Sequence, residues 1–216
     1  MTAPLWRVQT YEQPALVLGC SQRALHERLL ATPAGPPMAL LRRESGGGAV
    51  LTGPWLVSVS LALPPDHPWL GQGLLESYRQ LGQLHADALA EVGVVAAALA
   101  PPQIAATQAA LAARGLPVVD WACFGSLSPW EVVDAQGRKL VGLAQRRRQT
   151  GVLLVAGTLV APPPWERLCE ALGQPHDAQV LSQRTVSCAQ LSGRPLASAD
   201  WREHIARRLA QALALA

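Results

Sequence analysis

Three consecutive glycines, Gly46, Gly47 and Gly48, constrain the fold of this chain more than any other feature. A glycine run is useful where a backbone must approach a ligand with no side chain in the way. Apolar runs at 50–51 and 56–63 have strand character, so we expect the glycines to lie between two pieces of sheet. This argues against a P-loop, which needs Lys-Ser/Thr and a helix next, and against the dinucleotide motif, which needs G-x-G-x-x-G. A plain hairpin loop is the alternative.

Apolar spacing along the rest of the chain switches between the strand period and the helix period. A length of 216 residues, half of them hydrophobic, suits one substantial core. We therefore expect a single α/β domain, a mixed sheet flanked by helices. Strands are expected at 14–19, 38–42, 50–51, 56–63, 94–99, 131–133, 140–144 and 151–160. Helices are expected at 23–32, 73–92, 104–114, 165–172 and 198–213.

Some local features lead to sharper expectations. The helix at 73–92 is expected to be the longest and to pack on one face of the sheet, with His85 on its surface. Ser198 is a plausible cap for the last helix. The segment 173–195 lacks a clear period and is expected to be mostly loop.

Charge and cysteine content narrow the class of partner. A net charge of +3 is too small to indicate nucleic acid as the main partner. The four cysteines have neither C-x-x-C spacing nor a nearby histidine pattern, so we expect no metal site and no disulfide framework. No secretory signal and no run of membrane-spanning length stand out, so we expect no membrane partner and a cytoplasmic location.

Lys139 is the single lysine of the chain, in which arginine carries nearly all positive charge. A composition that disfavours lysine elsewhere suggests that this position needs an ammonium group, although chance retention is the alternative. Lys139 is expected at the start of the second strand of a hairpin whose turn lies at 134–137. The run Arg146–Arg148 follows, either as a solvated charge run or as a contact for phosphate or an acidic carrier protein.

Two motifs carry a resemblance to a known family. The string Arg-Arg-x-Ser-Gly-Gly-Gly-Ala-Val at 42–50 resembles the signature of lipoate-protein ligases, which share their fold with biotin-protein ligases and octanoyltransferases. The segment 137–147 is similar to the family's G-R-K-(I/V)-x-G-S-A-Q-x-R, which contains its catalytic lysine. The resemblance extends from 16–19 to about residue 191. It implies one catalytic domain of biotin/lipoate-protein ligase type over 1–216, with no C-terminal accessory domain.

The glycine motif is nearer the ligase form, so the resemblance first implies a lipoate-protein ligase. Such an enzyme uses ATP and Mg²⁺ to convert lipoate or octanoate into an acyl-adenylate. It then transfers the acyl group to a lysine on the lipoyl carrier domain of a 2-oxoacid dehydrogenase or on the glycine cleavage H protein. Lys139 would bridge the acyl carbonyl and the phosphate, and Arg42 or Arg43 would hold a carboxylate or phosphate.

An octanoyltransferase is the alternative. Members of the ligase-like transferase branch carry Cys-Phe where this chain has Cys123-Phe124, and that cysteine accepts the acyl group. Here Cys123 would take octanoyl from an acyl carrier protein, and Lys139 would polarise the carbonyl. A free cysteine is otherwise most often a buried apolar residue. A third possibility is a non-catalytic family member that binds acyl ligands.

Departures from the family pattern bear on this choice. The segment 51–55 lacks the His/Gln-Asp and Gly-Asn that ligases place after the glycines, and Ala156 replaces a usual histidine. The apolar acyl pocket is expected around Val50, Val141 and Leu143. The candidate catalytic residues are Lys139 and Cys123, and the candidate ligand-binding residues are Gln22, Arg42, Arg43, Ser45, Gly46, Gly47, Gly48, Ala49, Gly142 and Ala144.

Overall fold

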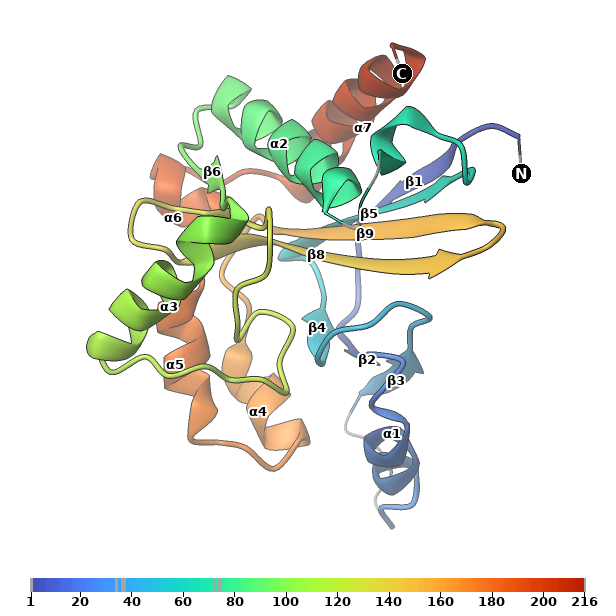
Figure 1. Ribbon diagram of the computed structural model, residues 1–216. Coiled ribbons are helices and arrows are strands. Elements are labelled where there is room, and N and C mark those ends of the chain that lie inside the picture. Colours follow the sequence, from blue (N-terminus) through green and yellow to red (C-terminus); the bar gives the residue numbers. More distant parts are fainter. Residues whose placement is uncertain (1, 34, 36–37, 72, 74, 216) are drawn as a thin grey trace.

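The computed structural model describes residues 2–33, 35, 38–71, 73 and 75–215. They form two sheets with helices packed around them (Figure 1). The larger sheet is antiparallel in every strand pair, and the mixed pairing expected from the sequence occurs in the smaller one. No helix of the described residues has the length and apolar character that crossing a bilayer requires.

The larger sheet has six strands in the order β1-β5-β9-β8-β7-β6. Inward-facing aliphatic side chains along its long strands, among them Val57, Leu61 and Leu154, are buried in the core. The strands are β1 (Leu5–Gln9), β5 (Leu56–Leu63), β6 (Ala97–Ala98), β7 (Val132–Val133), β8 (Lys139–Arg148) and β9 (Gly151–Leu159). The hairpin β7–β8 and the start of β8 at Lys139 confirm the sequence prediction, whereas the strand expected at 94–99 is shorter.

The smaller sheet has the order β3-β2-β4. Its strands are β2 (Ala15–Leu18), β3 (Ala39–Arg42) and β4 (Val50–Thr52). The pair β2–β3 is parallel and the pair β2–β4 is antiparallel. The glycine run lies between β3 and β4, which confirms its predicted position between two pieces of sheet.

Helices cover both sides of this framework. Figure 1 shows α2 and α7 side by side over one face of the larger sheet, and the smaller sheet with α1 on the opposite side. In that view α3 and α6 lie at the left of the larger sheet, and α4 and α5 lie below them. The bounds are α1 (Arg23–Leu30), α2 (Glu76–Glu91), α3 (Ile104–Ala113), α4 (Trp165–Ala171), α5 (Asp177–Arg184), α6 (Cys188–Ser192) and α7 (Ser198–Ala214), with short 3₁₀ turns at Pro68–Leu70 and Pro101–Gln103.

The prediction for the helix at 73–92 was wrong in two respects. Helix α7 has 17 residues and α2 has 16, so α7 is the longest helix of the described chain. His85 is fully buried, because it lies four residues from both Leu81 and Leu89 on the inward face of α2. Its Nδ1 lies 2.8 Å from the Leu81 carbonyl oxygen and donates to it, which satisfies one ring nitrogen inside the core.

The C-terminal third also differs from its prediction. The segment 173–195 contains α5 and α6, and α6 begins with a capping box between Ser187 and Gln190. The apolar period of these short helices is interrupted, because some of their buried positions carry polar side chains. In α5 the buried residue Arg184 donates from its guanidinium to the Leu116 carbonyl at 2.6 Å. Ser198 does not cap α7; its hydroxyl donates to the Pro54 carbonyl at 2.9 Å.

Candidate active site

A cavity of about 350 Å³ lies between the two sheets. Strands β5, β8 and β9 form its floor, and β2 and β4 cover it. Its walls are mainly apolar, with Val17, Val50, Leu56, Leu143 and Val155 among the lining residues. A mainly apolar cavity of this size with a few polar groups is typical of a small-molecule site.

Small residues lie along the floor of the cavity. Gly142, Gly157 and Ser58 lie opposite one another on three neighbouring strands. A Cβ atom at Gly142 would lie 3.1 Å from Cε of Lys139 and 3.5 Å from Cζ of Phe124. A side chain at Gly142 would therefore crowd both the lysine and the cavity, so glycine there serves close packing.

The glycine loop and the cysteine segment are joined by backbone hydrogen bonds. The N–H of Ala49 donates to the Trp121 carbonyl, and the N–H of Cys123 donates to the Ala49 carbonyl, both at 2.8 Å. A Cβ atom at Gly48 would lie 2.4 Å from the Trp121 carbonyl oxygen, and Gly47 has a φ of 95°. Gly47 and Gly48 thus allow the loop to approach the cysteine segment, whereas a Cβ at Gly46 would meet open space.

The two arginines before the glycines have different positions. The guanidinium of Arg43 donates to the carbonyls of Gly46 and Gly48, with closest distances of 2.9 and 2.8 Å. Arg43 also lines the cavity, but these hydrogen bonds show that its guanidinium stabilises the glycine loop. Arg42 is exposed on β3 and does not line the cavity. The structure therefore does not bear out a role for Arg42 in binding a ligand within the cavity.

Lys139 is buried at the edge of the cavity floor. Its Nζ lies 2.5 Å from Glu131 Oε1 and donates to the carbonyls of Cys123 and Ser126 at 2.8 and 3.1 Å. An ammonium has three N–H donors, and here each has an acceptor. The ring of Phe124 also packs against it, with its centroid 5.3 Å from Nζ. In this arrangement Lys139 binds the peptide of the candidate nucleophile. Lys139 was expected to bridge a ligand carbonyl and a phosphate, but no N–H of its ammonium is free to do so here.

Glu131 is a site residue that the sequence did not single out. Its Oε1 accepts a hydrogen bond from the Leu143 N–H and its Oε2 accepts one from the Ser128 N–H, at 3.1 and 2.8 Å. Burial raises the pKa of Glu131, and the Lys139 ammonium together with the two N–H groups opposes that effect. The sequence held one indication of this role. A buried lysine needs a counter-ion, and Glu131 directly precedes β7, the strand that pairs with the one on which Lys139 lies.

Cys123 is half-buried and lines the cavity. Two other thiols, those of Cys169 and Cys188, are fully buried, and burial raises their pKa to about 11 and about 12. Cys20 is exposed and does not line the cavity. Of the four cysteines, Cys123 is the one placed to react with a molecule in the cavity.

The remaining candidate residues fall into two groups. Ser45 and Ala144 line the cavity, and the Ser45 hydroxyl is buried without a hydrogen-bond partner, so it is available to a ligand. Gln22 lies outside it: its side-chain amide donates to the Trp121 carbonyl at 3.1 Å and its oxygen accepts from the Gly19 N–H at 3.0 Å. Val141, expected in the acyl pocket, is buried elsewhere in the core.

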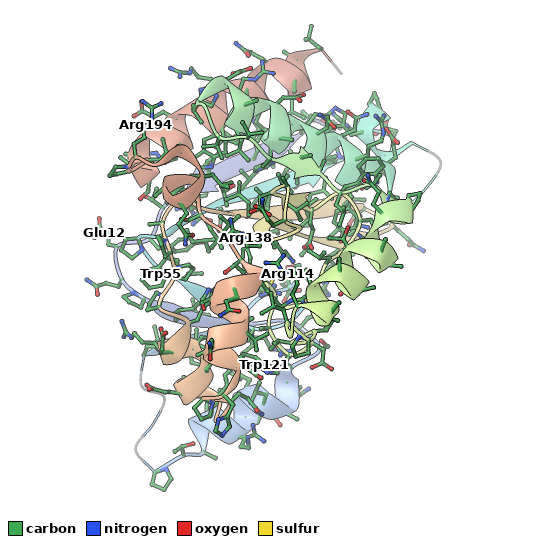
Figure 2. All side chains as sticks on the ribbon, turned by 90° about the vertical axis from the view of Figure 1, so that its left-hand side faces the viewer. Glu12, Trp55, Arg114, Trp121, Arg138 and Arg194 are labelled. Carbon is green, nitrogen blue, oxygen red and sulfur yellow. The ribbon has the colours of Figure 1, made fainter. Side chains whose placement is uncertain are left out.

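Trp121 anchors the cysteine segment from the other side. Its indole N–H donates to the Asp177 carboxylate on α5 at 2.7 Å. Figure 2 shows the labelled Trp121 beside the orange helices α4 and α5. Together with the bonds from Ala49 and Gln22, this contact fixes the approach of the chain to Cys123. Within the described ranges, no group of three or more His, Cys, Asp or Glu side chains could hold a metal ion.

Comparison with known proteins gives one family. A family model described as the lipoyl protein ligase A/B catalytic domain matches residues 4–210. The octanoyltransferase LipM of Kyrpidia tusciae is 30% identical over 216 residues, which cover 97% of this chain and 76% of the relative. The octanoyltransferase LipM of Moorella thermoacetica is 32% identical over 177 residues, which cover 82% of this chain and 60% of the relative.

Solved structures support the same fold. A lipoate-protein ligase A bound with ATP has a TM-score of 0.66 at 17% identity, covering 98% of this chain and 73% of that one. The bi-partite lipoate protein ligase of Thermoplasma acidophilum, described with its E2 lipoyl domain, has a TM-score of 0.63 at 16% identity, with coverages of 98% and 71%. At these identities the likeness establishes the fold and carries no statement about ligands.

Proposed function

The chain belongs to the lipoyl protein ligase A/B catalytic domain family, and from that premise we propose that it is an octanoyltransferase with Cys123 as its acyl acceptor. It is an enzyme of the lipoyl/octanoyl transferase type. The glycine motif favoured an ATP-dependent ligase, but the names of the relatives favour the transferase. The order of the two hypotheses is therefore reversed.

The position of Cys123 carries the proposal. Its half-buried side chain lies on the wall of an apolar cavity, and the carbonyl of the same residue accepts a hydrogen bond from the Lys139 ammonium at 2.8 Å. A half-buried thiol on the wall of an apolar cavity, in a peptide held by a buried ammonium, supports acyl transfer to Cys123.

The reaction has two steps. Sγ of Cys123 attacks the carbonyl carbon of an octanoyl thioester, the bond from that carbon to the carrier sulfur breaks, and the carrier leaves as a thiol with the proton that Cys123 loses. The Nζ of a lysine on the acceptor protein then attacks the enzyme thioester. An amide forms, Cys123 leaves as the sulfur leaving group, and the proton released by the amine returns to it.

Lys139 acts in this scheme through the peptide of Cys123. The ammonium fixes the Cys123 carbonyl, and Glu131 fixes the ammonium, so the cysteine loop is held in one geometry before substrate binds.

The family and the apolar cavity together suggest the substrates. We propose an octanoyl group delivered on an acyl carrier protein, and a lysine of a lipoyl carrier domain as the acceptor. The solved bi-partite ligase is described with its E2 lipoyl domain, which supports an acceptor of that class. ATP and Mg²⁺ are not needed for the transfer that we propose.

Intact-mass analysis tests the proposal. After incubation with octanoyl-acyl carrier protein and no ATP, we expect a mass increase of one octanoyl group that maps to Cys123. Cys123→Ser should lose the adduct and the transfer to an apo lipoyl domain. Cys20→Ser, which changes an exposed cysteine outside the cavity, should retain both.

Two parallel reactions define the contrary results. Loading of the lipoyl domain from free octanoate that requires ATP and Mg²⁺ and survives Cys123→Ser would establish the ligase. Binding of octanoate with no product in either assay would establish a non-catalytic acyl-binding protein.

A further inference from the structure

We propose that Tyr11 sets the length limit of the acyl chain by closing the side of the cavity that lies across from Cys123. This inference rests on the proposed acyl transfer, and it adds a residue that determines substrate specificity. Tyr11 belongs to neither of the family-like motifs, and it is one of only two tyrosines in the chain.

Tyr11 lies on the short link between the two sheets. The link leaves β1 after Gln9 and enters β2 at Ala15, so the chain crosses from the larger sheet to the smaller one there (Figure 1). The phenol is half-buried and lines the cavity. Its hydroxyl donates to the Ser58 hydroxyl on β5 at 2.9 Å.

Cys123 approaches the cavity from the other side of the floor. The adjacent Phe124 ring lies over β8 and β9, since Cβ atoms at Gly142 and Gly157 would be 3.5 and 3.9 Å from its Cζ. Tyr11 is bonded to Ser58, the residue opposite Gly157 on the next strand. Two strand spacings separate Gly142 from Ser58, which is about 10 Å.

The row Gly142, Gly157 and Ser58 marks a track across three strands of the cavity floor, and Phe124 packs over its glycine end. Cys123 and Tyr11 both line the cavity above this track, so an acyl chain attached to Cys123 can run along the cavity toward Tyr11. The chain then meets the Tyr11 ring at the far end. A medium-length acyl chain fits the span, and a longer one would have to displace the ring.

Contacts on both sides of Tyr11 hold the link between β1 and β2 in place. Gln9 pairs with Ser58 in the β1–β5 ladder, which holds the start of the link. The Thr52 hydroxyl donates to the Ala15 carbonyl at 3.2 Å, which holds its end. With both ends of the link held, the ring has little freedom to move aside.

The test is a chain-length series on the full chain. Thioesters of hexanoyl, octanoyl, decanoyl and dodecanoyl on acyl carrier protein are offered to the wild type and to variants, and acylation of Cys123 is followed by intact mass and kcat/KM. Tyr11→Ala opens the end of the track, so the dodecanoyl-to-octanoyl ratio of kcat/KM should rise by about 10-fold. Tyr11→Trp should shift the preference toward hexanoyl.

Tyr11→Phe is the matched control. It keeps the ring and removes only the hydrogen bond to Ser58, so the chain-length profile should stay as in the wild type. Comparing substrates within one variant cancels any loss of folded protein. An unchanged ratio in Tyr11→Ala and Tyr11→Trp, with octanoyl still found on Cys123, overturns the role of Tyr11. Absence of an adduct with every chain length in the wild type overturns the acyl-transfer proposal itself.

Discussion

Lys139 and Glu131 form a buried ion pair, with Nζ and Oε1 2.5 Å apart and each side chain 2% exposed. The same carboxylate accepts hydrogen bonds from the cysteine-bearing loop at Ser128 and from the cavity wall at Leu143. One side chain thus links the lysine, the loop that carries Cys123 and the floor of the cavity. Removing either partner of a buried pair leaves the other uncompensated.

A double-mutant cycle tests this link. Lys139→Met should destabilise the fold by about 3 kcal/mol and, by releasing the Cys123 peptide, lower kcat/KM by about 100-fold or more. In Lys139→Met/Glu131→Gln the loss should be smaller than the sum of the two single losses by about 1 kcal/mol or more, because no buried charge is left alone. Urea unfolding gives the free energies. Arg138→Met, at the partly exposed pair with Asp134, is the control and should cost about 1 kcal/mol or less.

The glycine run offers a contrast between two positions. Gly48→Ala places a Cβ 2.4 Å from the Trp121 carbonyl, so it should destabilise the protein by about 2 kcal/mol and lower acylation of Cys123. Gly46→Ala meets no atom within 4 Å and should change stability by about 0.5 kcal/mol or less. Thermal unfolding and acylation rates measure both. Equal effects at the two positions would contradict the docking of the loop on the cysteine segment.

The neighbouring arginines can be separated in the same way. Arg43→Ala leaves the carbonyls of Gly46 and Gly48 without their donor, so it should lower the free energy of unfolding by about 2 kcal/mol. Arg42→Ala, at an exposed site, should be within about 0.5 kcal/mol of the wild type. Denaturation and KM are measured together. A raised KM with unchanged stability in Arg43→Ala would instead indicate that its guanidinium binds the substrate.

His85 makes stability depend on pH. Burial lowers its pKa from 6.5 to about 4 in the folded protein, so on acidification the unfolded chain takes up a proton first. The free energy of unfolding should therefore fall as pH falls through that window, by about 2 kcal/mol between about pH 7 and about pH 5. His85→Gln should lose this part of the pH dependence. Urea titrations of both proteins at the two pH values give the difference, and identical slopes would refute the assignment.

Local sequence patterns were enough for the framework of the site. The glycines between two strands, the β7–β8 hairpin and Lys139 at the start of β8 all follow from residue order and short-range periodicity. Cys123 could be proposed only through the family resemblance, because an isolated cysteine has no local pattern. Its place on the cavity wall agrees with that proposal.

The features that were missed depend on contacts between distant segments. Tyr11 reaches Ser58 across 47 positions, and Arg43 turns back onto the loop that follows it instead of facing a ligand. Trp121 is placed by Asp177 on a helix that was expected to be loop. Periodicity shows which face of an element is buried, but it does not show which partner lies opposite.

The burial of Lys139 has a consequence for the enzyme's own surface. The chain has no other lysine, and this ε-amine is held inside by a carboxylate and two carbonyls. In the transfer that we propose, the acyl group on Cys123 therefore meets no exposed lysine in this chain. No lysine side chain here would compete with the lysine of the acceptor protein.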